Sequence, residues 1–549
     1  MPTPALTRVR AAYDLIDRAH RPDIWITLRP RADAEAEAHE VDKRLAAGAR
    51  LPLAGLTLAV KGNIDVHGIP TTAGCPSYAY DPTADAPAVA RLRAAGAVVL
   101  GSTNMDQFAT GLVGTRSPYG AVHSADDPAR VAGGSSSGSA VAVALRIADL
   151  ALGTDTAGSG RVPAAFNRIV GLKPTRGLVP TDGVVPACAS LDCVSVFART
   201  VQDAELALAL IATRPGHATA PRTPGPWRIA VPPTEQLGEM DDGWAEAYEA
   251  AAARLEAAGA QLGAIDPTPF TDAAAMLYDG AFVAERYTAV GSFIDKATKD
   301  LDPTVTAIVR RARDIPAHEL FADQARLAAL RARALAALAD TDADALLLPT
   351  APGHPTLAEV AADPFGANAR LGRFTNSTNL FDLAAVAVPG DDVAGRPFGV
   401  MLVGPAGTDD RLARIAAHLT APAPSVRIAV VGAHLSGQPL NHQLLALGAT
   451  LAGTTTTAPN YRLFALRTDP PKPGLVRVSS GGRPVEAEIW ELPPEGLGAL
   501  TAALPRPMAI GRVELADGST APGFLCEPAA LDDAEDITAY GGWRAYRNS

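Results

Sequence analysis

Short apolar runs alternate with Gly-rich breaks between residues 51 and 200, and this alternation limits the folds open to the chain. The strand-like runs are residues 56–62, 97–104 and 149–155, and the helical patterns between them are 87–96 and 137–147. Strands that alternate with helices and are apolar throughout predict an α/β domain with a largely buried sheet.

The pattern changes near residue 421. Before it, further helical stretches are 244–259, 323–340 and 408–419, and further strand-like runs are 345–352 and 397–405. Residues 421–425 are rich in Pro and Ala and are the best linker candidate. After them, short strands separated by Pro and Gly turns predict a small β-rich domain. We therefore expect two domains, residues 1–421 and 426–549.

Composition excludes several classes of function. The chain has 48 Lys and Arg against 59 Asp and Glu, a net charge of −11, and no basic patch interleaved with aromatics, so we expect no nucleic-acid partner. No run of 18 apolar residues is present, so we expect no membrane span. Four scattered cysteines predict reduced thiols rather than a disulfide framework. The first 20 residues read as an amphipathic helix rather than a signal peptide, and we expect a cytoplasmic protein.

Two Gly/Ser segments, GGSSSGSAVAVAL (133–145) and LGTDTAGSGRVPAAFN (152–167), are the strongest chemical signal. A flexible linker is the bland interpretation, but a linker does not usually lead directly into an apolar helix. Neither segment fits a phosphate-binding loop or the G-x-S-x-G elbow. A serine nucleophile with no His nearby in sequence needs another base, and a buried lysine can serve. Lys61, at the end of a strand-like run, is that candidate, although a strand-end lysine can simply extend to solvent.

These segments, together with LAVKGNIDVHGIPTTAG, GSTNMDQFATG and PFGVMLVGP, resemble the amidase signature family in the same order, over roughly residues 5–420. The resemblance implies a mixed central sheet covered by helices and a Ser–cis-Ser–Lys triad. Ser159 matches the nucleophile, Ser135 the bridging serine that precedes a cis peptide, and Lys61 the base. The implied oxyanion hole is formed by the backbone N–H groups of Thr156, Ala157, Gly158 and Ser159. No metal and no organic cofactor is implied.

The segment LYDGAFVAERY (277–287) resembles allophanate hydrolases within that family. Tyr278 and Arg286 match the residues that grip the substrate, and their spacing of eight predicts one helix face. A guanidinium suits a small planar carboxylate such as allophanate. By periodicity alone, a packed tyrosine and a surface arginine are the alternative.

Residues 430–450 and 484–493 resemble the γ-glutamyl cyclotransferase-like domain that is appended to allophanate hydrolases. The catalytic Glu of the cyclotransferases has no counterpart here, which argues against that activity. The resemblance implies that this domain assists decarboxylation of N-carboxycarbamate, with His434 as the matching histidine and His442 as a second choice. A structural role for His434 is an equally open interpretation.

The sequence therefore predicts an amidohydrolase that converts allophanate to N-carboxycarbamate and ammonia, with ammonia and CO₂ as the net products. One alternative is an amidase-signature hydrolase of another small amide. The other is a non-catalytic amidase-like subunit of a larger complex. The family further implies a homodimer and a link to other enzymes of urea degradation.

Overall fold

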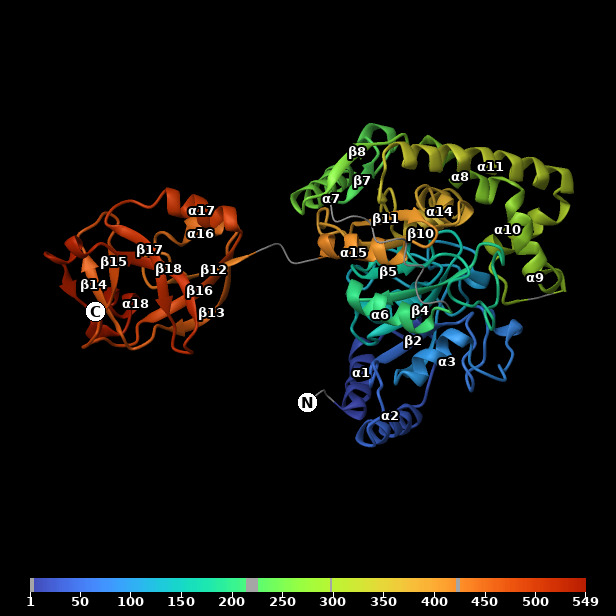
Figure 1. Ribbon diagram of the computed structural model, residues 1–549. Coiled ribbons are helices and arrows are strands. Elements are labelled where there is room, and N and C mark those ends of the chain that lie inside the picture. The colour runs from blue at the N-terminus through green and yellow to red at the C-terminus, as the bar shows by residue number, and fades with distance from the viewer. Residues whose placement is uncertain (1–3, 214–225, 297–298, 421–424) are drawn as a thin grey trace. The chain divides into compact units, whose positions relative to one another are not determined.

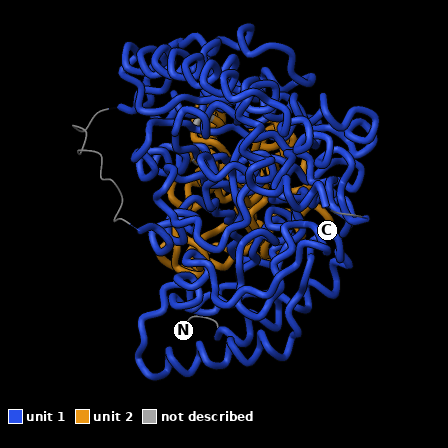
Figure 2. Tube along the Cα trace, turned by 90° about the vertical axis from the view of Figure 1, so that its right-hand side faces the viewer, with its two compact units in different colours: residues 1–420 blue, residues 421–549 orange. Residues whose placement is uncertain are grey.

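The computed structural model describes residues 4–213, 226–296, 299–420 and 425–549. The chain divides into two compact units, Met1–Thr420 and Ala421–Ser549 (Figure 2). The predicted linker, residues 421–425, lies outside the described residues except for Ser425.

One mixed sheet runs through the first unit, with helices around it (Figure 1). Its eleven strands, in spatial order, are β1 (Trp25–Leu28), β3 (Val98–Thr103), β2 (Thr57–Lys61), β4 (Leu150–Asp155), β6 (Cys193–Ala198), β5 (Val170–Lys173), β10 (Leu383–Pro389), β11 (Gly399–Pro405), β9 (Ala345–Pro349), β7 (Arg228–Val231) and β8 (Gln261–Ala264). The pairs β3–β2, β2–β4, β9–β7 and β7–β8 are parallel, and the others are antiparallel. The predicted α/β class and mixed sheet are confirmed.

Both faces of the inner strands of this sheet are buried, and the sequence shows why. Along β2, Leu58 and Val60 join one apolar core while Ala59 joins the other. Along β4, Leu152 and Ala151 divide in the same way. Alternate side chains of a strand point to opposite faces, so strands that are apolar at every position need cover on both sides.

Helices from distant parts of the sequence supply that cover. Those of the first unit are α1 (Ala5–Ala19), α2 (Arg31–Ala46), α3 (Pro87–Ala94), α4 (Ser137–Ala144), α5 (Val162–Phe166), α6 (Val201–Ile211), α7 (Trp244–Ala257), α8 (Thr268–Asp279), α9 (Ala284–Lys296), α10 (Pro303–Arg311), α11 (Ala317–Asp340), α12 (Leu357–Ala362), α13 (Gly366–Leu371), α14 (Asn376–Leu380) and α15 (Asp409–Thr420). Residues of α1, α2 and α4 form one core, and residues of α3, α6, α7 and α15 form the other. No helix in the described part of the chain is both long and apolar enough to cross a membrane.

The second unit is β-rich, as predicted, and has an apolar core of its own. Its five-stranded sheet is β13 (Thr450–Thr456), β16 (Glu486–Leu492), β12 (Val426–Val430), β18 (Thr520–Cys526) and β17 (Met508–Glu514) in spatial order. A smaller sheet is β15 (Lys472–Arg477), β14 (Tyr461–Leu466) and β19 (Glu535–Asp536), and the helices are α16 (Asn441–Ala446), α17 (Pro494–Ala502) and α18 (Trp543–Arg547).

Candidate active site

Lys61, the last residue of β2, is fully buried and bonded to two hydroxyl groups. Its Nζ donates to Ser135 Oγ at 2.8 Å and to Thr154 Oγ1 at 2.7 Å. Burial lowers the pKa of Lys61 to about 7, because an ammonium loses its hydration in the interior. An amine with that pKa is partly neutral near neutral pH and can accept a proton from a bonded hydroxyl.

Ser135 lies in the turn that leads into α4, and its peptide bond with Gly134 is cis. The cis bond was expected after Ser135, and that detail was wrong: the bond precedes the serine. Gly134 packs so closely against Asp106 that a Cβ on Gly134 would overlap Asp106 Oδ2. The same carboxylate accepts the N–H groups of Val113 and Gly114, and the Asp106 N–H donates to Ser135 O at 3.1 Å. Asp106 thus holds the turn that carries Ser135.

Ser159 lies in the turn after β4 and is 2% exposed. Among the described residues its hydroxyl has no hydrogen-bond partner, so the structure joins Lys61 to Ser135 but does not join Ser135 to Ser159. A serine hydroxyl without a protein partner is free to face a substrate.

The backbone N–H groups around Ser159 are not all available. The Gly158 N–H donates to Asp155 Oδ1 at 2.8 Å, which removes it from the predicted oxyanion hole. The N–H groups of Thr156, Ala157 and Ser159 have no acceptor in the described part of the chain. These three groups are the remaining candidate donors to an oxyanion.

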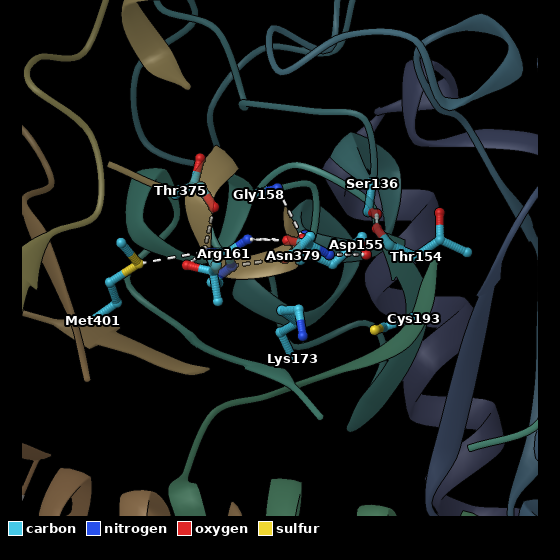
Figure 3. A network of polar contacts seen from close by, with 12 residues as sticks. Ser136, Thr154, Asp155, Gly158, Arg161, Lys173, Cys193, Thr375, Asn379 and Met401 are labelled. Atoms are coloured by element: carbon cyan, nitrogen blue, oxygen red, sulfur yellow. Dashed lines mark hydrogen bonds and ion pairs between the residues drawn. The ribbon is translucent and has the colours of Figure 1, made fainter. Parts of the chain in front are cut away.

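A buried ion pair, which was not predicted from the sequence, holds this turn (Figure 3). Asp155 accepts Gly160 N at 3.0 Å and both Nε and Nη2 of Arg161 at 2.9 Å. Arg161 also donates to Thr375 O and to the side chains of α14. Burial acts to raise the pKa of Asp155, but the charge and hydrogen bonds of Arg161 hold it below its ordinary value. The signal was present, because Asp and Arg flank the turn in DTAGSGR.

Tyr278 and Arg286 are in contact, but they lie on two different helices, and the prediction that they share one helix face was wrong. Tyr278 lies on α8 and Arg286 on α9, because α8 ends at the Asp279–Gly280 step. An Asp-Gly pair is a common end signal for a helix, and the spacing argument passed over it. Arg286 Nη2 donates to Tyr278 Oη at 3.1 Å, and the guanidinium lies 5.0 Å from the centre of the tyrosine ring.

Arg286 is 1% exposed and has no carboxylate within ion-pair distance in the described chain. Its Nη1 donates to Thr110 Oγ1 at 2.9 Å, and its Nε is buried without a partner. A buried cation in this state favours an anion from outside the protein. Burial lowers the pKa of Lys61 most, the carboxylates of Asp106, Asp192 and Asp155 raise it, and the charge of Arg286 lowers it by a smaller amount. Tyr278 packs against the apolar cluster that contains Ala157. These contacts place Tyr278 and Arg286 near Ala157 and Lys61.

His434 lies in the second unit, on the loop after β12. Its ring stacks on Phe524, with the centres 4.6 Å apart, and its Nε2 meets Gln443 Oε1 at 3.1 Å. Burial lowers the pKa of His434. His442 is exposed and bonds to Pro439 O, so the structure separates the two candidates by burial.

The fold and the paired Gly/Ser turns define the class of this protein. Residues 8–413 match the amidase family model, so the chain belongs to the amidase family. Residues 426–548 match the model described as the allophanate hydrolase C-terminal domain.

The urea amidolyase of Lachancea kluyveri is 42% identical over 572 residues, which cover 95% of this chain and 31% of that protein. The chain thus spans about a third of the length of the first curated relatives it matches. The structure of SeMet-substituted Kluyveromyces lactis allophanate hydrolase matches with a TM-score of 0.70 and 38% identity, and covers 100% of this chain and 97% of that one. One subunit of the glutamyl-tRNA(Gln) amidotransferase of Thermosynechococcus vestitus is 36% identical over 68% of this chain and 85% of its own length.

Proposed function

We propose that the chain is an allophanate hydrolase that acts through Lys61, Ser135 and Ser159. The observation that carries the proposal is Arg286, a buried guanidinium that has no carboxylate partner in the described chain and lies beside Tyr278. Allophanate carries one carboxylate and one terminal amide, so an arginine that binds the carboxylate orients the amide for attack. The similarity to allophanate hydrolase over both units supports the same substrate.

In the proposed mechanism, the oxygen of Ser159 attacks the amide carbon. As it does so, Ser159 gives its proton to Ser135, and Ser135 gives its own proton to neutral Lys61. The N–H groups of Thr156, Ala157 and Ser159 stabilise the oxyanion. The C–N bond breaks and the leaving nitrogen takes a proton, so that ammonia departs. Water then attacks the acyl-enzyme, which releases N-carboxycarbamate and restores the serine.

The second unit acts on that product in this proposal. A C–N bond of N-carboxycarbamate breaks, CO₂ leaves, and the electron pair stays on nitrogen, which takes a proton from solvent next to His434. The carbamate that remains breaks down to ammonia and CO₂, so ammonia and CO₂ are the net products. The family also leads us to infer a homodimer, which sedimentation equilibrium of the full chain tests, and an association with other urea-degrading enzymes.

The test is ammonia release from allophanate by the purified chain alone. We expect Ser159→Ala to abolish it and Arg286→Ala to abolish it while hydrolysis of a neutral amide such as acetamide persists. Arg333→Ala, which removes an exposed cation of α11, is the matched control and leaves both activities intact. Equal loss of the two substrates in Arg286→Ala would instead favour a hydrolase of another small amide.

The similarity to one component of an amidotransferase keeps a second candidate open, a subunit that works only in a complex. Turnover of allophanate by the isolated chain, lost in Ser159→Ala, excludes that candidate. Absence of turnover until other subunits are added would support it.

A further inference from the structure

A cavity of about 530 Å³ lies in the second unit, between α16, α17 and the strands β15, β17 and β18. Aliphatic and aromatic side chains form most of its wall, among them Leu500, Leu504 and Met508. Its lining, taken over the described residues, holds three polar side chains, His434, Gln443 and Lys472, and no carboxylate. The cavity therefore offers one permanent cation and nothing that repels an anion.

Lys472 is the charged residue of this cavity, and the proposed mechanism leaves it unused. It is the only lysine between residues 425 and 549, it lies at the start of β15, and it is half-buried. Its ammonium has no hydrogen bond and no ion pair with any described residue. Arg544, by contrast, is held by Glu486 and Glu488. A lysine at an apolar cavity without a carboxylate is available to a ligand.

His434 lies close enough to that lysine for their charges to interact. Burial has the largest effect on the pKa of the imidazole and lowers it, and the charge of Lys472 lowers it further by a smaller amount. The ring cannot turn freely, because Phe524 stacks on it at an angle of 3° and Gln443 binds Nε2. Its Nδ1 has no protein partner in the described chain. The cavity thus presents an imidazole held by two neighbours and, among the described residues, an unpaired ammonium.

We propose that Lys472 is the anion-binding residue of the second unit and that the cavity takes a small carboxylate or N-carboxylate next to His434. The inference deepens the proposed function, on which its assignment to N-carboxycarbamate rests. One ammonium can neutralise one of the two carboxylates of that dianion. The other then meets the apolar wall, where a charged group is destabilised relative to neutral CO₂. Lys472 retains one carboxylate while the opposite C–N bond breaks, CO₂ leaves, and the nitrogen takes the proton.

Malonate is the probe, because it has two carboxylates on one central atom and does not lose CO₂ under mild conditions. The full chain carries Arg286→Gln, which removes the anion site of the first unit. We expect calorimetric titration to show one malonate site per chain, and Lys472→Met to weaken it by about tenfold or more, as loss of a charged hydrogen bond does. Lys472→Arg keeps the charge and retains binding. Arg512→Met, which removes an exposed cation of β17 outside the cavity, leaves the affinity unchanged.

Two results would overturn the inference: malonate binding that Lys472→Met leaves unchanged, or no malonate binding in the Arg286→Gln chain. Neither result depends on amide hydrolysis. If the wild-type chain releases no ammonia from allophanate while malonate still binds through Lys472, the proposed function fails and the anion site stands.

Discussion

At the scale of single residues, the environment of each side chain decides its chemistry. Lys61 and Lys173 are both fully buried lysines of the same sheet. Lys61 bonds two hydroxyls, whereas Lys173 donates to the carbonyl oxygens of Pro174 and Leu383. A hydroxyl can give up its proton and a carbonyl cannot, so only Lys61 can begin a proton relay.

The pKa of Lys61 predicts the pH dependence of hydrolysis. Below about 7 the amine is protonated and cannot accept a proton, so we expect the rate to rise with pH through that value. Lys61→Met should remove both the rise and most of the turnover, as ammonia release on either side of neutrality would show. Lys173→Met is the control, and we expect the hydrolysis rate of this variant still to rise with pH through about 7. A rise that survives in Lys61→Met would contradict Lys61 as the base.

Thr110 is expected to position Arg286 for the anion. Its hydroxyl accepts from Arg286 Nη1 and donates to Phe108 O at 3.2 Å. Thr110→Val removes the acceptor at similar volume, and we expect KM for allophanate to rise by about tenfold, the worth of one charged hydrogen bond. The kcat for acetamide should change little, and Thr288→Val, an exposed threonine of α9, should change neither. An unchanged KM for allophanate would show that Thr110 has no such role.

At the scale of elements, the turn after β4 is held from within. Asp155 closes the turn through Gly158 N and Gly160 N, and Arg161 ties it to α14 and, through the Sδ of Met401, to β11. The turn is therefore bonded to two elements that are distant in sequence. Its backbone donors are preorganised before any substrate binds, which is the condition for a useful oxyanion hole.

Asp155→Asn should weaken the whole first unit. It leaves the guanidinium of Arg161 buried without its counter-charge, and we expect the free energy of unfolding to fall by about 3–5 kcal/mol, with loss of activity. Asp392→Asn breaks the exposed pair with Arg168 and should cost less than about 1 kcal/mol. Urea denaturation of the two variants gives the comparison. Similar losses in both would show that the buried pair contributes no more than a surface pair.

At the scale of the whole molecule, each compact unit has apolar cores of its own. The cores of the first unit and the core of the second share no residue. Each unit thus buries its own apolar surface and has the means to unfold separately.

A cavity cut into one core should therefore lower one unfolding transition alone. Leu463, on β14, and Leu402, on β11, are both fully buried. We expect Leu463→Ala to lower the free energy of unfolding of the second unit by about 2–5 kcal/mol. The calorimetric transition of the first unit and the release of ammonia from allophanate should stay unchanged. Leu402→Ala, the reciprocal variant, should lower the transition of the first unit. A single transition that shifts in both variants would contradict independent units.

Much of the fold was predictable because the spacing of apolar residues along a segment shows which faces of that segment are buried. Strands that are apolar at every position, such as β2 and β4, predicted a sheet covered on both faces. Near residue 421 the sequence changes to short strands separated by Pro and Gly turns, and this change predicted a β-rich second unit. The Gly/Ser segments marked the two turns that carry Ser135 and Ser159. The break between α8 and α9 was missed, because a spacing of eight matches one helix face whether or not a helix continues through it.

What the sequence determined, then, is the order of elements and the residue types at the site. Only the tertiary structure decided which groups are paired. It placed Thr110 beside Arg286, 176 positions away in the sequence, and left that arginine without a carboxylate in the described chain. It also bonded the Gly158 N–H to the Asp155 carboxylate. It also placed Lys472 and His434 at one apolar cavity. Partnerships of this kind depend on which distant segments pack together, and no local pattern of hydrophobicity or spacing records that.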